Sequence, residues 1–293
     1  MPTTKLFNLY NKNALVTGGA AGIGRACATA LAMGGANIAI VDLDEVAGLK
    51  TVADLKAMGV DALFVACDVS DEQQVNAMTT TVVTHFGSLD IAINNAGICI
   101  AREDQTQPKK DWDKMLAVNL TGVWLCAKTQ AEQMIKQQPC GGKIINIASI
   151  ASKLVGGGCP AYASSKAGVV HLTRVLASQW GGHNINVNCI SPGTVMTPLV
   201  ASYSAETRQH LRGKTPLGYL MRPQDIQGAV VYLASAASDY MTGQELVLDG
   251  GYATMNHSDK EYYERAVPPR VSAEDEVIEM NSDLAAVGDP KQR

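Results

Sequence analysis

The sequence predicts an α/β fold with a single doubly wound parallel sheet of about seven strands and helices on both faces. Short apolar runs, many of them β-branched, alternate with stretches of helical spacing along most of the 293 residues. Strands that are apolar without interruption are typical of a parallel sheet covered on both faces. A hydrophobic fraction of 46% provides the apolar side chains that such a core requires.

The expected strands are the apolar runs at residues 14–17, 37–42, 62–67, 89–94, 143–148, 185–190 and 245–248. Stretches with helical periodicity lie between the first six of these runs. Because a helical crossover returns the chain to the same end of the sheet, successive strands are expected to run parallel.

Local signals mark where several helices begin. Asp44 is suited to cap the helix after the second strand. Ser70 and Gln73 have the spacing of a capping box, ahead of an amphipathic stretch that ends near Gly87. Pro223 stands where a first helical turn tolerates proline, and we expect a helix over residues 225–233.

Strand and helix alternation continues to Gly251, which predicts one dinucleotide-binding and catalytic domain over residues 1–252. From Tyr252 onward the chain has nine acidic and five basic residues, so all of its formal net charge of −4 belongs to this end. Residues 253–293 are therefore expected to form an acidic tail, flexible or docked on a partner subunit, with a short helix over 272–280.

Composition excludes several classes of protein. A neutral body with an acidic tail argues against nucleic acid as a partner. No apolar run approaches the roughly 18 residues of a membrane span, and the first residues lack a signal-peptide core. Seven scattered cysteines without a C-x-x-C pair indicate reduced thiols and a cytoplasmic protein, and five dispersed histidines predict no metal site.

A glycine-rich turn follows the first strand directly. Residues 17–24 read TGGAAGIG and precede a helix that is expected to open near Arg25. Glycines let the backbone approach a pyrophosphate, and the helix N-terminus supplies free N–H groups and a positive dipole end. In isolation the string would indicate only a turn, but its position between strand and helix predicts a nucleotide site in a Rossmann-type sheet.

The second strand ends in Asp42, which favours NAD over NADP as the cofactor. A carboxylate at this position can accept hydrogen bonds from the adenosine ribose hydroxyls and would repel a 2′-phosphate. Leu43 follows, and the glycine-rich turn holds no Arg or Lys. The alternative is that Asp42 only caps the next helix, a role for which Asp44 is better placed.

The spacing G-x-x-x-G-x-G resembles that of the short-chain dehydrogenase/reductase family, and further family motifs occur in order over about residues 10–252. They include Asn94-Asn95-Ala96-Gly97 and Leu248-Asp249-Gly250-Gly251. The resemblance implies cofactor contacts with the pyrophosphate, the ribose, the adenine and the nicotinamide at Gly18, Ala21, Gly22, Ile23, Gly24, Asp42, Leu43, Asp68, Val69, Asn95, Ala96, Gly97, Tyr162, Lys166, Pro192, Gly193, Val195 and Thr197.

A second group of residues suggests chemistry. Tyr162 and Lys166 are four residues apart, so a helix places them on one face. Ser149 follows the fifth strand, at the sheet edge where ligands of open α/β sheets bind. Oxidation of an alcohol releases a proton to a base, and a cation beside a tyrosine lowers its pKa toward neutrality.

The same family resemblance implies that Ser149, Tyr162, Lys166 and Asn119 form a catalytic tetrad. Tyr162 would be the general acid/base, and Lys166 would lower its pKa and hold the nicotinamide ribose. Ser149 would donate a hydrogen bond to the substrate oxygen, and Asn119 would position a water through which the proton reaches solvent.

The sequence thus predicts an oxidoreductase that transfers a hydride between NAD(H) and a secondary alcohol or ketone, with a polyol, a sugar or another small secondary alcohol as substrate. Two alternatives stay open: a 3-oxoacyl thioester reductase using NADPH, and a non-catalytic NAD-sensing protein. The resemblance also implies a homotetramer assembled through helices at about 112–137 and 162–180.

Overall fold

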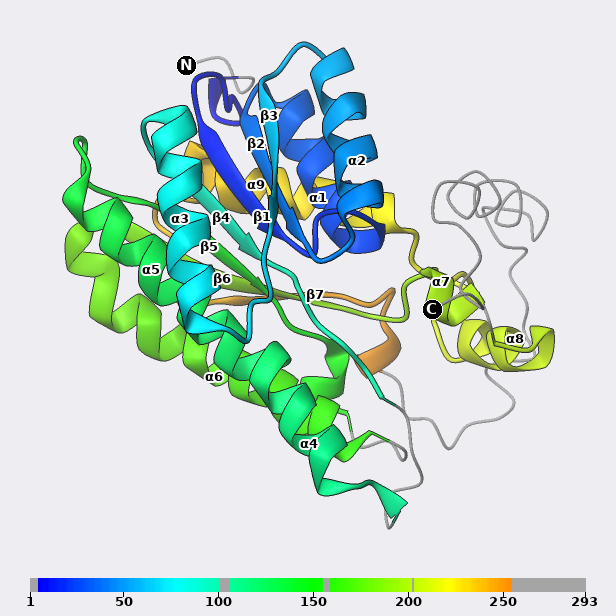
Figure 1. The fold of residues 1–293 in the computed structure, drawn as a ribbon. Coiled ribbons are helices and arrows are strands. Elements are labelled where there is room, and N and C mark those ends of the chain that lie inside the picture. The colour runs from blue at the N-terminus through cyan, green and yellow to red at the C-terminus, as the bar shows by residue number, and fades with distance from the viewer. Residues whose placement is uncertain (1–4, 101–105, 155–158, 202, 255–293) are drawn as a thin grey trace.

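A computed structural model describes residues 5–100, 106–154, 159–201 and 203–254. Within these ranges, parallel strands form one sheet in the order β3-β2-β1-β4-β5-β6-β7 (Figure 1). This confirms the predicted fold class, and the observed strand ends differ from the predicted ones by at most two residues. The strands are β1 (Asn13–Thr17), β2 (Asn37–Asp42), β3 (Ala62–Ala66), β4 (Ile91–Asn94), β5 (Gly142–Ile147), β6 (Ile185–Pro192) and β7 (Glu245–Leu248).

Helices connect these strands, and a π-helical segment, Ala117–Gly122, joins α4 to α5. A 3₁₀ turn, Pro223–Ile226, leads into the helix that Pro223 predicts. The helices are α1 (Gly22–Met33), α2 (Glu45–Ala57), α3 (Glu72–Phe86), α4 (Lys109–Leu116), α5 (Val123–Lys136), α6 (Pro160–Trp180), α7 (Pro198–Ala201), α8 (Ala205–Gly213) and α9 (Gln227–Ala234).

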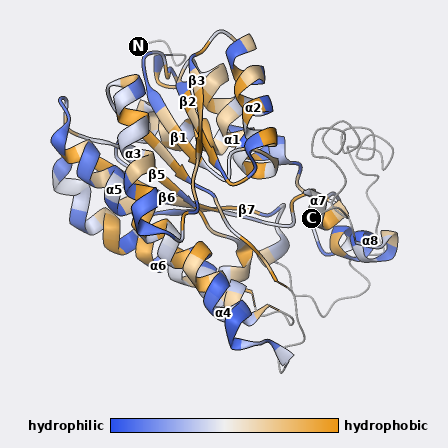
Figure 2. Cartoon of the chain, in the orientation of Figure 1, coloured by the Kyte–Doolittle hydropathy of each residue, from blue (hydrophilic) through white to orange (hydrophobic). Residues whose placement is uncertain are grey.

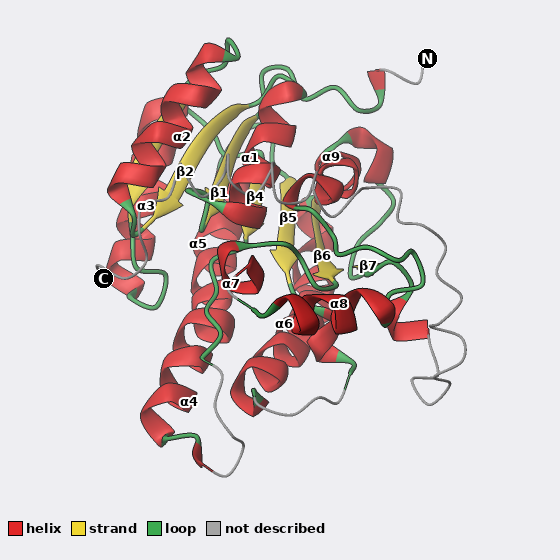
Figure 3. Cartoon of the chain, turned by 90° about the vertical axis from the view of Figure 1, so that its right-hand side faces the viewer, coloured by secondary structure: helices red, strands yellow, loops and turns green. Residues whose placement is uncertain are grey.

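Helices lie on both faces of the sheet (Figure 3), and apolar side chains form a buried core on each face. Ala14 and Val16 of β1 pack with side chains of α1, α2 and α9. Leu15 lies between them in sequence and packs with α3, α5 and α6 on the opposite face. Because successive strand residues alternate between two cores, the strands are mostly apolar (Figure 2).

The strand order reverses between β1 and β4, and this topology positions the functional site. The chain first adds β2 and β3 on one side of β1 and then crosses to add β4 on the other. Thr17, at the end of β1, is therefore paired with Val41 on one side and Asn94 on the other. A crevice forms at the carboxyl ends of the strands where the order reverses, and ligands bind there.

Side-chain caps begin α2 and α3. Asp44 accepts a hydrogen bond from the Ala47 N–H at 3.1 Å, as predicted. The predicted cap at Ser70 is wrong by one residue, because the Asp71 carboxylate accepts the first free N–H groups of α3. The Ser70 hydroxyl instead donates to the Asp68 carboxylate at 2.7 Å.

The predicted tail over residues 253–293 lies outside the described residues except for Ala253 and Thr254, and so does its expected helix over 272–280. The division of the chain into a domain and a tail stays a prediction. In the part of the chain that the structure describes, no helix combines the length and apolar character needed to cross a membrane.

Candidate active site

The glycine-rich turn is closed too tightly for side chains. Gly18 and Gly22 have positive φ values of 61° and 54°, which L side chains rarely adopt. A Cβ on Gly24 would lie 1.9 Å from the Gly18 carbonyl oxygen. The N-cap residue of α1, Ala21, makes no side-chain hydrogen bond, and the first turn of α1 has no acidic residue. Together these features leave the N-terminus of α1 suited to an anion.

Side chains at the ends of β1 and β4 brace this turn. The Thr17 hydroxyl accepts hydrogen bonds from the N–H groups of Asn95 at 3.0 Å and Ala96 at 3.1 Å. The Asn95 amide donates to the carbonyls of Thr17 and Gly18, both at 3.0 Å. Two of the predicted cofactor residues, Asn95 and Ala96, thus lie against the turn. Thr17 was not among the predicted site residues, although a hydroxyl residue at the end of a strand and before a glycine indicates such a role.

Asp42 lies beside the turn and is held by backbone donors. Its Oδ2 accepts the Ala20 N–H at 3.0 Å, and its Oδ1 accepts the N–H groups of Leu43 at 2.8 Å and Asp44 at 3.1 Å. A carboxylate can accept about four hydrogen bonds, so Asp42 keeps capacity for a ligand hydroxyl. The Leu43 side chain is 70% exposed next to it.

Asp68 and Val69 follow β3 as expected, and both have structural roles. The Asp68 Oδ1 accepts hydrogen bonds from the N–H and the hydroxyl of Ser70 at 2.9 and 2.7 Å. Val69 is buried, and its Cγ2 lies 2.9 Å from where a Cβ on Gly122 would stand. The pair therefore shapes the entry to α3 and packs on the π-helical segment.

The segment after β6 reaches across to the glycine-rich turn. Gly193 follows Pro192, the last residue of β6, and Val195 is buried. The Cγ2 atom of Thr197 lies 3.8 Å from where a Cβ on Gly22 would stand. Thr197 and the turn therefore flank the same space, as expected for residues that contact one ligand.

Ser149, Tyr162 and Lys166 converge at the carboxyl end of β5. Tyr162 and Lys166 lie on one face of α6, with the Lys166 Nζ 5.7 Å from the Tyr162 ring centroid. Lys166 is only 4% exposed and donates to the Ile147 carbonyl at 2.8 Å. Ser149, which follows β5, hydrogen-bonds with the Tyr162 side chain. The structure thus brings three of the four predicted catalytic residues into one polar cluster.

Asn119, the fourth residue, is fully buried in the π-helical segment and joins that cluster to the loop after β4. Its Oδ1 accepts the Ile98 N–H and its Nδ2 donates to the Ile98 carbonyl, both at 2.8 Å. Its Nδ2 also donates to the Ser165 hydroxyl at 3.3 Å, which donates to the Tyr162 carbonyl. A Cβ on Gly97 would lie 3.2 Å from the Asn119 Oδ1, so the loop passes close by.

The electrostatics of the cluster differ from the sequence expectation. Burial lowers the pKa of Lys166 to about 8. Burial also raises the pKa of Tyr162, and the hydrogen bond with Ser149 lowers it by a smaller amount. The expected lowering of the Tyr162 pKa by Lys166 is therefore not what the structure gives. The physical reason is that burial disfavours the Tyr162 phenolate, while the Lys166 Nζ is directed to the Ile147 carbonyl and lies 5.7 Å from the tyrosine ring.

A buried polar network behind the site was not predicted from the sequence. Gln130 of α5 donates to the Asn94 Oδ1 at 2.8 Å, and the Asn94 Nδ2 donates to the Asn146 Oδ1 at 3.0 Å. The Asn146 Nδ2 then donates to the Thr173 hydroxyl at 3.0 Å. These bonds tie β4 and β5 to α5 and α6, and fix the strand ends that carry the site.

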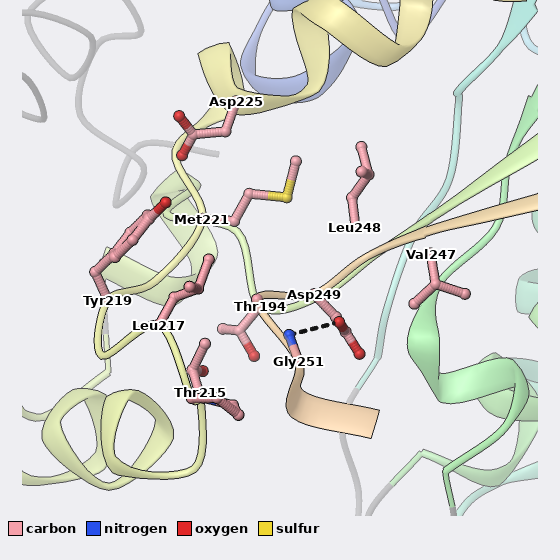
Figure 4. A pocket seen from close by; sticks show the side chains of 13 residues that line it. Thr194, Thr215, Leu217, Tyr219, Met221, Asp225, Val247, Leu248, Asp249 and Gly251 are labelled. Carbon is pink, nitrogen blue, oxygen red and sulfur yellow. Dashed lines mark hydrogen bonds between the residues drawn. The ribbon is translucent and has the colours of Figure 1, made fainter. Parts of the chain in front are cut away.

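A cavity of about 510 Å³ lies at the ends of β6 and β7 (Figure 4). No member of the predicted tetrad lines it. The carboxylate of Asp249 is occupied by the N–H groups of Gly251 and Ala253, and that of Asp225 by the Arg222 N–H and guanidinium. Since its acidic groups are committed locally, we assign the chemistry to the polar cluster. The lining residues are Gly193, Thr194, Thr215, Pro216, Leu217, Tyr219, Met221, Asp225, Val247, Leu248, Asp249, Gly250 and Gly251.

Comparisons with known proteins agree with this geometry. Residues 18–253 match the family model described as enoyl-(acyl carrier protein) reductase. The chain is 41% identical over 249 residues to 2-dehydro-3-deoxy-D-gluconate 5-dehydrogenase of Dickeya dadantii, covering 84% of this chain and 97% of that relative. It is 40% identical over 248 residues to D-threitol dehydrogenase of Mycolicibacterium smegmatis, covering 84% and 94%.

A solved structure shows the same fold. The short-chain type dehydrogenase/reductase from Mycobacterium marinum superposes with a TM-score of 0.83 at 38% identity, covering 86% of this chain and 99% of that one. A family model that matches most of the chain, relatives aligned over nearly their whole length and the shared seven-stranded sheet lead to one conclusion. The chain belongs to the short-chain dehydrogenase/reductase family of oxidoreductases.

Proposed function

We propose that this protein is an NAD(H)-dependent dehydrogenase that interconverts a secondary alcohol and its ketone on a polyol or a sugar acid. The observation that carries the reaction type is the convergence of Ser149, Tyr162 and Lys166 at the carboxyl end of β5. The names of two relatives, a 2-dehydro-3-deoxy-D-gluconate 5-dehydrogenase and a D-threitol dehydrogenase, support a small polyhydroxylated substrate.

The residues at the crevice fit a nicotinamide dinucleotide. The uncapped N-terminus of α1 and the tight turn at Gly18 and Gly22 would take the pyrophosphate. Asp42 would accept a ribose hydroxyl with its remaining capacity and would disfavour a 2′-phosphate, which supports NAD over NADP. When bound, the cofactor supplies the hydride acceptor for alcohol oxidation.

Side chains of the protein transfer the proton of the substrate hydroxyl. In oxidation the phenolate form of Tyr162 accepts the proton of the substrate hydroxyl and becomes a phenol, and in reduction that phenol gives its proton to the nascent alkoxide. Burial raises the pKa of Tyr162 and lowers that of Lys166 to about 8, so the phenolate that oxidation requires becomes more available as pH rises. Ser149 orients the substrate oxygen by a hydrogen bond.

Asn119 acts as a positioning residue in this proposal. Its amide holds Ile98 by two hydrogen bonds and reaches Ser165, which is bound to the Tyr162 backbone. Loss of Asn119 would release the loop after β4 from α6. The same side chain is the one that family resemblance assigns to the water relay.

A screen of alcohols and ketones with all four nicotinamide cofactors tests the proposal. We expect NAD-dependent oxidation of polyols or sugar acids, which is measured by the absorbance of the reduced cofactor. Reduction of an acetoacetyl thioester by NADPH, without polyol oxidation, would favour a 3-oxoacyl thioester reductase, the activity named for a Staphylococcus aureus relative that is 36% identical over 245 residues. Tight NAD binding with no turnover on any substrate would favour a sensor.

We also infer a homotetramer in which the outer faces of α5 and α6 are subunit contacts. Two large apolar side chains are exposed there: Trp124 is 43% exposed and Val175 is 40% exposed. The Lys128 ammonium lies 5.7 Å from the Trp124 ring centroid. Multi-angle light scattering is expected to give the tetramer mass, and a stable monomer would contradict the inference.

A further inference from the structure

Two thiols lie in contact beside the proposed active site. The Sγ atoms of Cys99 and Cys159 are 3.2 Å apart although 60 residues separate them in sequence. Both side chains are partly exposed. By contrast, four of the other cysteines, Cys27, Cys67, Cys126 and Cys189, are buried.

Each thiol belongs to a segment that positions a proposed catalytic residue. Cys99 directly follows Ile98, which the Asn119 amide holds by two hydrogen bonds. Cys159 is the N-cap residue of α6 and stands three residues before Tyr162. Negative charge on either sulfur raises the pKa of Tyr162, so both thiols act on it electrostatically.

We propose that Cys99 and Cys159 form a redox modification site that a hydroperoxide converts to an intramolecular disulfide, and that this bond switches off turnover at Tyr162. Formation of the bond does not depend on the proposed function, whereas its effect on turnover rests on that function. Mass and activity therefore test the two parts separately.

The two thiols are suited to different steps. Cys159 is partly exposed at the N-terminus of a 21-residue helix, and we assign it the reaction with the peroxide. Its thiolate would attack a peroxide oxygen, break the O–O bond and become a sulfenic acid, with release of an alcohol or water. Burial raises the pKa of Cys99 to about 12, which keeps it a thiol until the second step.

In that second step the Cys99 sulfur bonds to the sulfenic sulfur of Cys159. The Cys99 proton leaves with the hydroxyl group as water, so two thiols and one peroxide become one disulfide. A dithiol reductant reverses the change by thiol–disulfide exchange.

Formation of the bond requires movement at the active site. A disulfide joins its sulfurs at about 2.05 Å, so the two Sγ atoms must approach by more than 1 Å. The two side chains can rotate or the segments that carry them can shift, and the bond then ties the loop that Asn119 anchors at Ile98 to the first turn of α6. A displacement of about 1 Å at Tyr162 is expected to lower kcat by about tenfold or more.

The test treats the purified full-length protein with hydrogen peroxide and then with dithiothreitol. We expect a cross-linked peptide containing Cys99 and Cys159, loss of kcat by about tenfold or more, and recovery on reduction. Each of Cys99→Ser and Cys159→Ser is compared with its own untreated sample. After peroxide treatment, each variant should keep its activity and should not show the loss of two thiol hydrogens that marks the disulfide. The control is Cys140→Ser, a half-buried cysteine bonded to the His183 carbonyl, which should respond like wild type.

Absence of the disulfide between Cys99 and Cys159 in protein whose Cys140 thiol has been oxidised would overturn the proposal. Equal, dithiothreitol-reversible inactivation of the serine variants would also overturn it. A link that forms while NAD-dependent turnover is unchanged would refute the switch. If no turnover is found on any substrate, the proposed function fails, but the peptide link still decides whether the site exists.

Discussion

Substitution of Gly24 by alanine tests whether close backbone packing shapes the dinucleotide turn. A Cβ at this position would lie 1.9 Å from the Gly18 carbonyl oxygen and 2.6 Å from the Asn95 Nδ2. Ordinary van der Waals contact begins at 3.4 Å, so the turn would have to open by about 1.5 Å. The blocking oxygen is a backbone atom, so it cannot move away as the end of a flexible side chain could.

Overpacking of this kind costs about 1–3 kcal/mol, and we expect a value near 2 kcal/mol for Gly24→Ala. For a domain of this size that lowers Tm by about 4–8 °C. Because the turn itself is displaced, the Kd for NAD should rise by about tenfold or more, which corresponds to about 1.4 kcal/mol. Calorimetry and a fluorescence titration with NADH measure the two effects.

Gly181→Ala is the matched control. Gly181 has a helical φ of −57°, and no atom lies within 4 Å of its would-be Cβ. This variant should keep its NAD affinity and gain roughly 0.4–1 kcal/mol of stability. A Gly24→Ala protein that melts and binds NADH like wild type would refute the packing argument for the turn.

Three further predictions concern charged side chains. Asp42→Asn should reduce the preference for NAD over NADP by about tenfold or more in kcat/KM, because the charge that would repel a 2′-phosphate is gone. Asp44→Ser, which keeps a helix cap, should leave this preference unchanged. Equal NAD-to-NADP ratios of kcat/KM in the two variants would refute the role of Asp42. The buried Lys166 has a folded-state pKa of about 8 against an ordinary 10.5, so its stability cost is complete at low pH and fades as pH rises between these values. Urea titrations at pH 7 and pH 9 should therefore show wild type gaining about 1 kcal/mol relative to Lys166→Met, and a difference that does not change with pH would contradict the shift. Glu245→Gln should lower the free energy of unfolding by about 1–3 kcal/mol in the same assay. The Glu245 side chain is 5% exposed, and the substitution removes its 3.0 Å ion pair with Lys153 and the charge that accepts a 2.6 Å hydrogen bond from the Ser191 hydroxyl. Asp113→Asn, which breaks an exposed pair, should cost under about 1 kcal/mol, and similar losses in the two variants would remove the case for Glu245.

The fold could be predicted from the sequence because its signals are local. β1 is five residues long and wholly buried, and the turn after it can be read from glycine spacing alone. The end of β2 and the helix cap at Asp44 follow from single residues and their neighbours. The error at Ser70 arose because two adjacent polar residues both suit an N-cap, and only the folded turn shows that Ser70 donates to Asp68.

Side-chain contacts between distant segments could not be predicted. The bond between Asn94 and Gln130 spans 36 residues, and the contact between Cys99 and Cys159 spans 60. Such contacts depend on how the helices pack against the sheet, and residue spacing in the sequence does not predict that packing. The predicted lowering of the Tyr162 pKa is absent for the same reason, since the direction of the shift depends on burial and on where the Lys166 side chain points.

The central claim is that Tyr162 transfers the proton in an NAD-dependent oxidation. Its most direct test compares wild type with Tyr162→Phe on the best substrate from the alcohol screen, with the Kd for NADH measured in parallel. We expect turnover to fall by about 10²–10⁴-fold while the Kd stays close to the wild-type value, because only a hydroxyl is removed. A Tyr162→Phe enzyme that turns over like wild type would contradict the claim.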